Sequence, residues 1–375
     1  MVKIPAVKKV GKLYISASRV PALSLSPWAG SLTGFAHRLR KATLLGLVWL
    51  CGCGRLPAGL RAPSEIWAMG GALDDTAVVS EPVLSGVDAI AEFEFVLDSV
   101  SFRPTLAARR GSAQPKAAPT DLATKELDVR RLAVVTSFQG SRYHPETVRA
   151  LAGDPQALAA TAGALASAAA ASSARGIVID LQGMTTKDLQ AVIDVIRAVA
   201  DSAAAYALGP VAFVVPPGDT AGYPAAVIGR SASLIVARLY AEHHAGTAPG
   251  PTASPSWFIR QLGMRTAEVG SSRIVAELPL FGYRWERNGT ARRITFAEAR
   301  ADVLAGAVTL RRDPASRSLH ASSSIGGWEI WVPDRETIET LIATARRLGV
   351  RRFALNGVSG ADPEIWTALR TAVTR

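Results

Sequence analysis

Short apolar runs alternate with amphipathic stretches along the chain from residue 64 onward. The apolar runs are rich in β-branched or aromatic residues and are bounded by Gly, Pro or polar clusters, which is typical of buried strands. Eight such runs are predicted as strands, at residues 65–69, 90–97, 132–138, 176–180, 211–215, 233–240, 273–280 and 352–356.

Helical periodicity fills the intervals between these runs. In residues 187–205 and 334–350 the apolar side chains recur on one helical face, and Gly349 is placed to end the second helix. An alanine-rich run at 157–174 is also predicted as a helix. Strands that alternate with helices in this way favour an α/β fold, a (β/α)8 TIM barrel. A doubly wound Rossmann sheet is the alternative, but no predicted strand leads into G-x-G-x-x-G.

One segment breaks the alternation of strands and helices. The stretch "AVTLRRDPASRSLHASSSIGGWEIWV", residues 307–332, contains two alternating strands around a polar tip with glycines. We expect a small antiparallel insertion between the seventh and eighth units of the barrel, at about 286–332. The predicted barrel domain, with this insertion, covers residues 64–375.

The first 63 residues have the pattern of a targeting segment. "HRLRKATLLGLVWLCGCG" contains a basic run, a short apolar stretch and then small residues with cysteine, which is the layout of a secretory signal. The apolar stretch is too short to span a bilayer comfortably. "LCGC" also resembles a bacterial lipobox, in which Cys53 would be lipidated after cleavage. We expect an exported protein of the cell envelope with a lipid anchor in the membrane; a simple signal peptide or an N-terminal membrane anchor is the alternative.

The composition describes a globular protein with a sizeable core, because 49% of residues are hydrophobic and 19% are charged. The net charge of +11 raises the question of nucleic acid. The arginines, however, are scattered rather than gathered with aromatic residues, so no nucleic-acid partner is predicted. Cys51 and Cys53 are the two cysteines, and the five histidines lack metal-ligand spacing. We therefore predict no disulfide framework, no metal and no cofactor.

Functional side chains of a TIM barrel lie at the carboxyl ends of its strands. There, "RGIVIDLQ" resembles the fourth-strand signature of family 18 glycoside hydrolases, chitinases and spore-cortex-lytic relatives, written D-G-x-D-x-D-x-E. "LIVARLYAEH" looks like their sixth strand, which ends in Met-x-Tyr-Asp, and "AELPLFGYRW" is similar to their seventh, G-x-P-x-Y-G-Y-x-W. The tail from "WEIWV" to "DPEIW" follows their last unit. The resemblance covers residues 64–375 and implies a TIM barrel.

The resemblance also implies a mechanism in which the substrate's own N-acetyl group assists cleavage. In this family a glutamic acid protonates the leaving oxygen, an aspartate two residues earlier orients the acetamido group, and a sixth-strand tyrosine binds its carbonyl. Asp180 and Tyr240 keep the last two positions, but Gln182 occupies the position of the acid. An amide has no titratable proton, so it cannot supply general acid catalysis, which is generally worth about 10²–10⁴-fold in rate.

Other positions depart from the family pattern as well. Val178 and Arg175 replace the two earlier aspartates, and Ala241 replaces the aspartate after the tyrosine. Asn356 stands where the family has the tryptophan that forms the floor of the sugar subsite. These departures all fall on the catalytic face, so the resemblance predicts lost or strongly impaired hydrolysis.

Several side chains could still bind a glycan. Trp67 on the first strand, and Tyr283 and Trp285 after the seventh, are expected near the mouth of the barrel, although Trp67 and Tyr283 could equally be packing residues. Three hypotheses remain open. The protein binds an N-acetylated glycan, peptidoglycan or chitin-like, without cleaving it; or it is a glycosidase of altered mechanism that uses another carboxylate, such as Glu242; or it is a structural, partner-binding lipoprotein.

Overall fold

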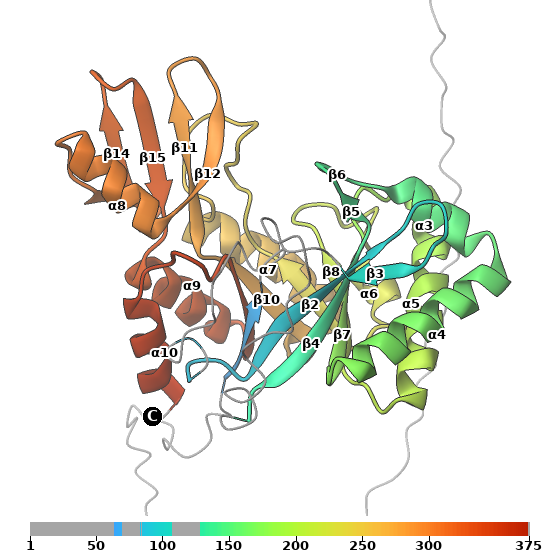
Figure 1. Cartoon of the computed structure of the whole chain (residues 1–375). Coiled ribbons are helices and arrows are strands. Elements are labelled where there is room, and N and C mark those ends of the chain that lie inside the picture. The colour runs from blue at the N-terminus through green and yellow to red at the C-terminus, as the bar shows by residue number, and fades with distance from the viewer. Residues whose placement is uncertain (1–63, 70–82, 84, 107–127, 374–375) are drawn as a thin grey trace, which may run out of the picture. The chain divides into compact units, whose positions relative to one another are not determined.

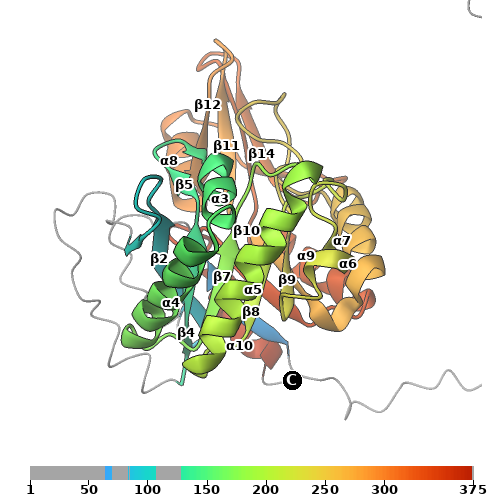
Figure 2. The same ribbon diagram turned by 90° about the vertical axis from the view of Figure 1, so that its right-hand side faces the viewer.

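Eight parallel strands form a closed barrel in which each strand lies beside its neighbours in chain order (Figures 1 and 2). The computed structural model describes residues 64–69, 83, 85–106 and 128–373. The ring closes because β16 pairs in parallel with both β1 and β10, and β1 pairs with β2. All eight predicted strands are confirmed: β1 (Glu65–Met69), β2 (Ala89–Leu97), β4 (Arg130–Thr136), β7 (Gly176–Asp180), β8 (Val211–Val215), β9 (Leu234–Arg238), β10 (Ile274–Pro279) and β16 (Arg352–Asn356).

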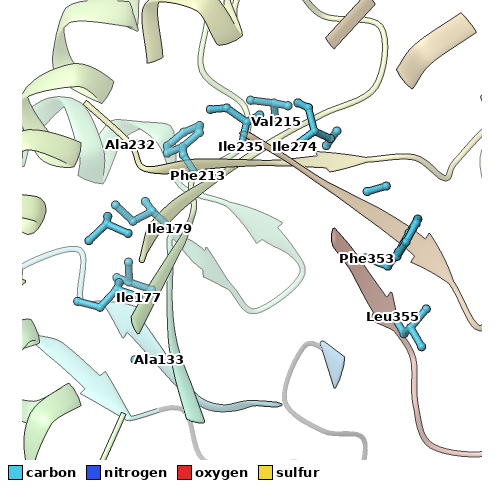
Figure 3. Close-up of a cluster of buried hydrophobic side chains, with 14 of the residues drawn as sticks. Ala133, Ile177, Ile179, Phe213, Val215, Ala232, Ile235, Ile274, Phe353 and Leu355 are labelled. Carbon is cyan, nitrogen blue, oxygen red and sulfur yellow. The ribbon is translucent and has the colours of Figure 1, made fainter. Parts of the chain in front are cut away.

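Side-chain alternation along each strand divides the core into two parts. On β7, Val178 packs with the residues inside the barrel, whereas Ile177 and Ile179 pack outward beneath the helices. Figure 3 shows side chains of this outer layer, including Phe213 and Phe353, which belong to one apolar cluster. Because both faces of each strand are covered, the strands read as nearly continuous apolar runs, which is why the sequence identifies them well.

Helices surround the barrel. They are α3 (Pro145–Ala152), α4 (Pro155–Ala171), α5 (Leu189–Ala205), α6 (Ala225–Ile228), α7 (Pro255–Val269), α9 (Arg335–Arg347) and α10 (Glu364–Val373), with 3-10 turns at η2 (Thr186–Asp188) and η3 (Ser271–Arg273). The three helices predicted from periodicity and composition correspond to α4, α5 and α9. Gly349 follows the end of α9 with φ +82°, a conformation that favours glycine.

The insertion lies between β10 and β16, as predicted, and is larger than predicted. It is a five-stranded antiparallel sheet in the order β12-β11-β15-β14-β13, with one helix. The prediction of only two strands is wrong because β11, whose aromatic residues alternate with other residues, follows β10 directly, and because β12 consists largely of polar residues. The elements are β11 (Phe281–Glu286), β12 (Ala291–Thr295), α8 (Phe296–Ala305), β13 (Arg311–Arg312), β14 (Leu319–Ser323) and β15 (Trp328–Val332).

The insertion sheet has two unlike faces. One face packs against α8 through a small core that includes Ile294, Ile330 and Val303. Figure 1 shows this sheet standing beyond one end of the barrel, above α9 and α10. Two smaller elements extend the fold: β3 (Pro104–Leu106) pairs with β2, and β5 (Phe138–Gln139) forms a hairpin with β6 (Arg142–Tyr143).

The expected targeting segment, with Cys53, lies outside the described residues. Within the described part of the chain, none of the helices is long and apolar enough to cross a membrane.

Candidate functional site

Polar side chains converge inside the barrel at the carboxyl ends of its strands. Strand alternation explains their direction: Val178, Val236 and Ala354 point inward, so the side chains two residues later do the same. Those side chains are Asp180, Arg238 and Asn356, and Glu277 points inward two residues after Val275 on β10. Together with flanking side chains they form what we call the central network: Tyr143, Asp180, Gln182, Arg238, Tyr240, Glu277 and Asn356.

Asp180 accepts three hydrogen bonds within this network. Its Oδ1 accepts one from Gln182 Nε2 at 2.7 Å. Its Oδ2 accepts one from Arg238 Nη2 at 2.9 Å and one from the Tyr143 hydroxyl at 2.9 Å. Burial and the negative charge of Asp180 raise the pKa of Tyr143 well above its ordinary value. The Tyr143 hydroxyl therefore stays protonated and acts as a donor.

Arg238 lies between two carboxylates. It forms one ion pair with Asp180 at 2.9 Å and another with Glu277 at 3.3 Å. Burial works against the charge of Arg238, but the carboxylates of Asp180 and Glu277 outweigh burial and raise its pKa well above the usual range. The Glu277 side chain is 0% exposed. A carboxylate at that depth is tolerated because charged and polar donors surround it.

Glu277 also accepts from neutral donors on neighbouring strands. Its Oε1 accepts from Asn356 Nδ2 at 2.7 Å and from the Tyr240 hydroxyl at 3.2 Å. Burial raises the pKa of Tyr240 well above its ordinary value, and the nearby Arg238 only partly opposes this effect. Tyr240 therefore remains a neutral donor whose hydrogen bond goes to Glu277.

Gln182 is buried, with 7% of its surface exposed. Its Nε2 donates to Asp180 Oδ1 at 2.7 Å and to the Val214 carbonyl at the end of β8 at 3.1 Å. Gly183 follows with φ +79°, so the chain turns sharply after the glutamine. Both hydrogens of the amide therefore have acceptors. A deprotonated carboxylate at this position has no hydrogen to donate, so it would leave both acceptors without a donor.

The loop that carries Gln182 is anchored on both sides. The Tyr223 hydroxyl donates to the Leu181 carbonyl at 3.0 Å and accepts from the Met184 N–H at 2.9 Å. Asp188 accepts from Arg149 Nε at 2.6 Å. Hydrogen bonds from Arg149 hold the pKa of Asp188 well below its usual range, against a smaller effect of burial. The loop is therefore positioned by fixed contacts at neutral pH.

A ladder of aromatic rings leads from the central network into the insertion. The ring centroids of Tyr240 and Phe281 are 5.4 Å apart, those of Phe281 and Tyr283 5.9 Å, and those of Tyr283 and Trp285 5.7 Å. The Trp285 indole N–H donates to the Thr247 carbonyl in the loop after β9 at 3.0 Å. These contacts join the inserted sheet to the end of the barrel.

The second face of the insertion sheet carries a row of side chains across four strands. The strand register places Arg293 opposite Tyr283, Tyr283 opposite Trp331, and Trp331 opposite His320. Tyr283, Trp331 and His320 are half-buried and Arg293 is exposed. We call this row, with Trp285 beside it, the aromatic face. A groove of about 340 Å³ adjoins it, lined by Trp285, Glu329 and three consecutive serines, 322–324, among others.

The structure brings four of the predicted site residues together. Asp180, Gln182, Tyr240 and Asn356 all belong to the central network. Tyr283 and Trp285 lie on β11, in the adjoining aromatic face.

Two predicted site residues lie elsewhere. Trp67 is 0% exposed, and its indole N–H donates at 2.7 Å to Glu65, at the opposite end of β1 from the mouth. Its expected place at the mouth is wrong, and its alternative role in packing is the one observed. Both carboxylate oxygens of Glu242 accept from Ser254 at the start of α7, from its N–H at 2.5 Å and its hydroxyl at 2.9 Å.

Sequence reasoning missed Arg238, Glu277 and Tyr143. A signal existed for the first two, because Arg238 stands at the Met of Met-x-Tyr-Asp and Glu277 at the first Gly of G-x-P-x-Y-G-Y-x-W. Each departure alone looks like an unfavourable buried charge. Only the pairing of β9 with β10, where Glu277 lies opposite Arg238, shows that they neutralise each other.

The described residues contain no group of three or more His, Cys, Asp or Glu side chains that could hold a metal ion.

The chain is 26% identical over 169 residues to a protein of Bacillus subtilis (strain 168) named as a sporulation-specific glycosylase, YdhD. That match covers 43% of this chain and 40% of the relative, so the chain spans less than half of the relative's length. No protein-family model matches the chain.

Solved structures share the fold of this chain. A chitinase from Chromobacterium violaceum has a TM-score of 0.71 and 17% identity, covering 83% of this chain and 99% of that one. The Bacillus cereus spore cortex-lytic enzyme SleL has a TM-score of 0.72 and 15% identity, covering 84% and 76%. A Glu-to-Gln mutant of the class V chitinase from Nicotiana tobaccum, in complex with NAG4, has a TM-score of 0.65 and 14% identity, covering 84% and 98%.

The chain therefore has the TIM-barrel fold of chitinases and spore cortex-lytic enzymes. This confirms, for the fold, the resemblance to family 18 glycoside hydrolases that the strand-end motifs indicated.

We predict strong coupling between Arg238 and Glu277. Arg238→Met should lower the free energy of unfolding by about 3–5 kcal/mol, because it leaves Glu277 buried without its charged partner. Adding Glu277→Gln should recover part of that loss, so that the double variant costs about 1–3 kcal/mol less than the sum of the single variants. Denaturant unfolding of the two single variants, the double variant and the wild type measures these free energies. Arg352→Met, which breaks a more exposed ion pair with Glu65 at the other end of the barrel, is the control. Strictly additive losses at Arg238 and Glu277 would contradict the coupling.

Proposed function

We propose that this protein is an exported, envelope-tethered barrel that binds an N-acetylated glycan, peptidoglycan or chitin-like, and does not hydrolyse it. One observation carries the proposal. Gln182 occupies the position of the acid, and its amide donates to both Asp180 and the Val214 carbonyl inside a hydrogen-bonded network. The barrel keeps the place of a glycosidase site without the group that protonates the leaving oxygen.

Glycan binding is supported by the aromatic face. Half-buried Tyr283 and Trp331 lie opposite each other on neighbouring strands, and aromatic rings of this kind pack against the C–H surfaces of sugars. The adjoining groove adds serine hydroxyls and the Glu329 carboxylate, which can hydrogen-bond sugar hydroxyls. Proteins of the same fold are named for activity on chitin and spore cortex, and one of them holds NAG4.

The loss of hydrolysis is supported by the state of the candidate proton donors in the described network. Asp180 accepts hydrogen bonds from Gln182, Tyr143 and Arg238. Gln182 has no acidic proton. Glu277 is fully buried, paired with Arg238 and hydrogen-bonded by Asn356. Tyr143 and Tyr240 have raised pKa values, so they are poorer acids than free tyrosine.

The binding of the central sugar also differs from that of the family. Asn356 stands where the family has a stacking tryptophan, and its amide donates to Glu277 rather than offering a ring face. Tyr240, which binds the acetamido carbonyl in the family, donates to Glu277 here. The proposal therefore places glycan affinity mainly on the aromatic face, outside the central network.

Affinity for glycans can be tested by pull-down of the full chain on insoluble peptidoglycan and on chitin. We expect retention of the wild type on at least one polymer. Trp331→Ala should weaken retention about threefold to tenfold, because one stacking surface is lost. Tyr206→Ala is the matched control, since Tyr206 is an aromatic residue exposed to 47% just after α5 and away from the aromatic face. Failure of the wild type to bind either polymer would contradict the proposal.

The absence of hydrolysis can be tested with a chromogenic N-acetylglucosamine oligomer. We expect no release by the wild type, and none by Gln182→Glu alone. The new carboxylate would lie beside Asp180, and Asn356 and Glu277 would still occupy the floor of the site. An active chitinase serves as the positive control. Release by the single variant would contradict this prediction. Release by the wild type that Glu277→Gln abolishes would favour the glycosidase of altered mechanism.

The envelope anchor can be tested at Cys53. Cys53→Ala should move the protein from the membrane fraction to the soluble exported fraction of a bacterial host, because the acceptor of the lipid is removed. Cys51→Ala, two residues earlier, is the matched control and should leave the protein with the membranes. Equal fractionation of both variants would contradict the lipid anchor.

A further inference from the structure

Arg293 is a cation without a carboxylate partner among the described residues. It lies on β12 at the edge of the aromatic face, opposite Tyr283. Its guanidinium carbon is 3.6 Å from the centroid of the Phe281 ring, and its Nη2 makes a long contact of 3.5 Å with Asn356 Oδ1. The residue therefore connects the central network to the aromatic face, and no carboxylate of the described part of the chain pairs with it.

The preceding residue, Arg292, has different contacts from Arg293. Arg292 points to the other side of β12 and pairs with Glu298 at 3.2 Å and Asp302 at 3.2 Å. Both arginines are exposed on the same short strand. The difference is that Arg292 has two acidic neighbours from α8, whereas the surroundings of Arg293 are Phe281, Tyr283 and Asn356.

The contacts of Arg293 suit a carboxylate in particular. Stacking on Phe281 restrains the plane of the guanidinium and leaves donor edges directed sideways, and a planar guanidinium binds a carboxylate through two parallel hydrogen bonds.

We infer that Arg293 makes this site selective for an acidic glycan, an N-acetylated sugar chain with a free carboxylate such as the lactyl group of muramic acid. The inference rests on the proposed function and narrows it, because a neutral chitin-like chain offers nothing for this cation to pair with. Arg293 lies beside Tyr283 in the row, so a carboxylate on a sugar ring over Tyr283 would be near this cation; exposed Arg311, opposite His320, is at the other end of the row. Four neighbouring strands span about 14 Å, which is enough for more than one sugar.

The test compares two ligands that differ in one charge. The ligands are the disaccharide N-acetylglucosaminyl-N-acetylmuramic acid and the same disaccharide with its carboxyl group reduced to an alcohol. Both are titrated into the full-chain wild type, Arg293→Gln, Arg293→Lys and Arg292→Gln at low ionic strength. We expect the wild type to bind the acid about threefold to tenfold more tightly than the alcohol, and added salt to reduce this preference.

Arg293→Gln should remove the preference, so that this variant binds the acid and the alcohol equally. Arg293→Lys should keep part of the preference, since it retains charge but loses the planar pair of donors. Arg292→Gln, which changes net charge equally, should keep all of it. Equal binding of acid and alcohol by the wild type overturns the inference and leaves the proposed function intact. Equal loss of the preference for the acid in Arg292→Gln and Arg293→Gln also overturns it, because the attraction then depends on net charge and not on Arg293. Binding of neither disaccharide, together with failure on insoluble peptidoglycan and chitin, overturns both proposals.

Discussion

The ion pairs of Arg238 are the interaction on which the end of this barrel depends. A wholly buried Glu277 is compatible with folding only because Arg238 lies across from it on the next strand. The same guanidinium holds Asp180, which in turn accepts from Gln182 and Tyr143. Side chains from five segments of the chain are thus joined around one positive charge, and few of their donors and acceptors are left for a reacting substrate.

The proposed absence of hydrolysis rests on the state of the groups in this network. General acid catalysis needs a group whose proton can leave at neutral pH. Here the buried tyrosines hold their protons more firmly than usual, the buried carboxylate of Glu277 is paired with Arg238, and Gln182 beside Asp180 is an amide. The half-buried rings of Tyr283 and Trp331, together with exposed Arg293, lie instead on the insertion. The side chains that a ligand can contact there are therefore outside the central network.

Much of the fold could be predicted because parallel barrel strands are buried on both faces, and their runs of branched and aromatic residues are short and distinct. Two strands of the insertion were not predicted. β11 follows β10 almost without interruption, and β12 is rich in arginine and is recognised as a strand by its pairing with β11. In the site, Asp180, Gln182, Tyr240 and Asn356 could be placed together by their positions at strand ends. Trp67 could not, because its strand position puts it inside the barrel without saying toward which end its ring extends.

The sequence by itself determined the eight strands and their order, because these follow from local patterns, and it predicted Gln182 at the position of the family's acid from a single position in a motif. The tertiary structure alone decided which polar side chains neutralise one another. Arg238 and Glu277 are 39 residues apart, and Arg238 and Asp180 are 58 apart, so their pairing depends on strand register and barrel closure. For the same reason adjacent Arg292 and Arg293 differ: the two sides of one strand meet different neighbours, and among the described residues it is the side of Arg292 that meets carboxylates.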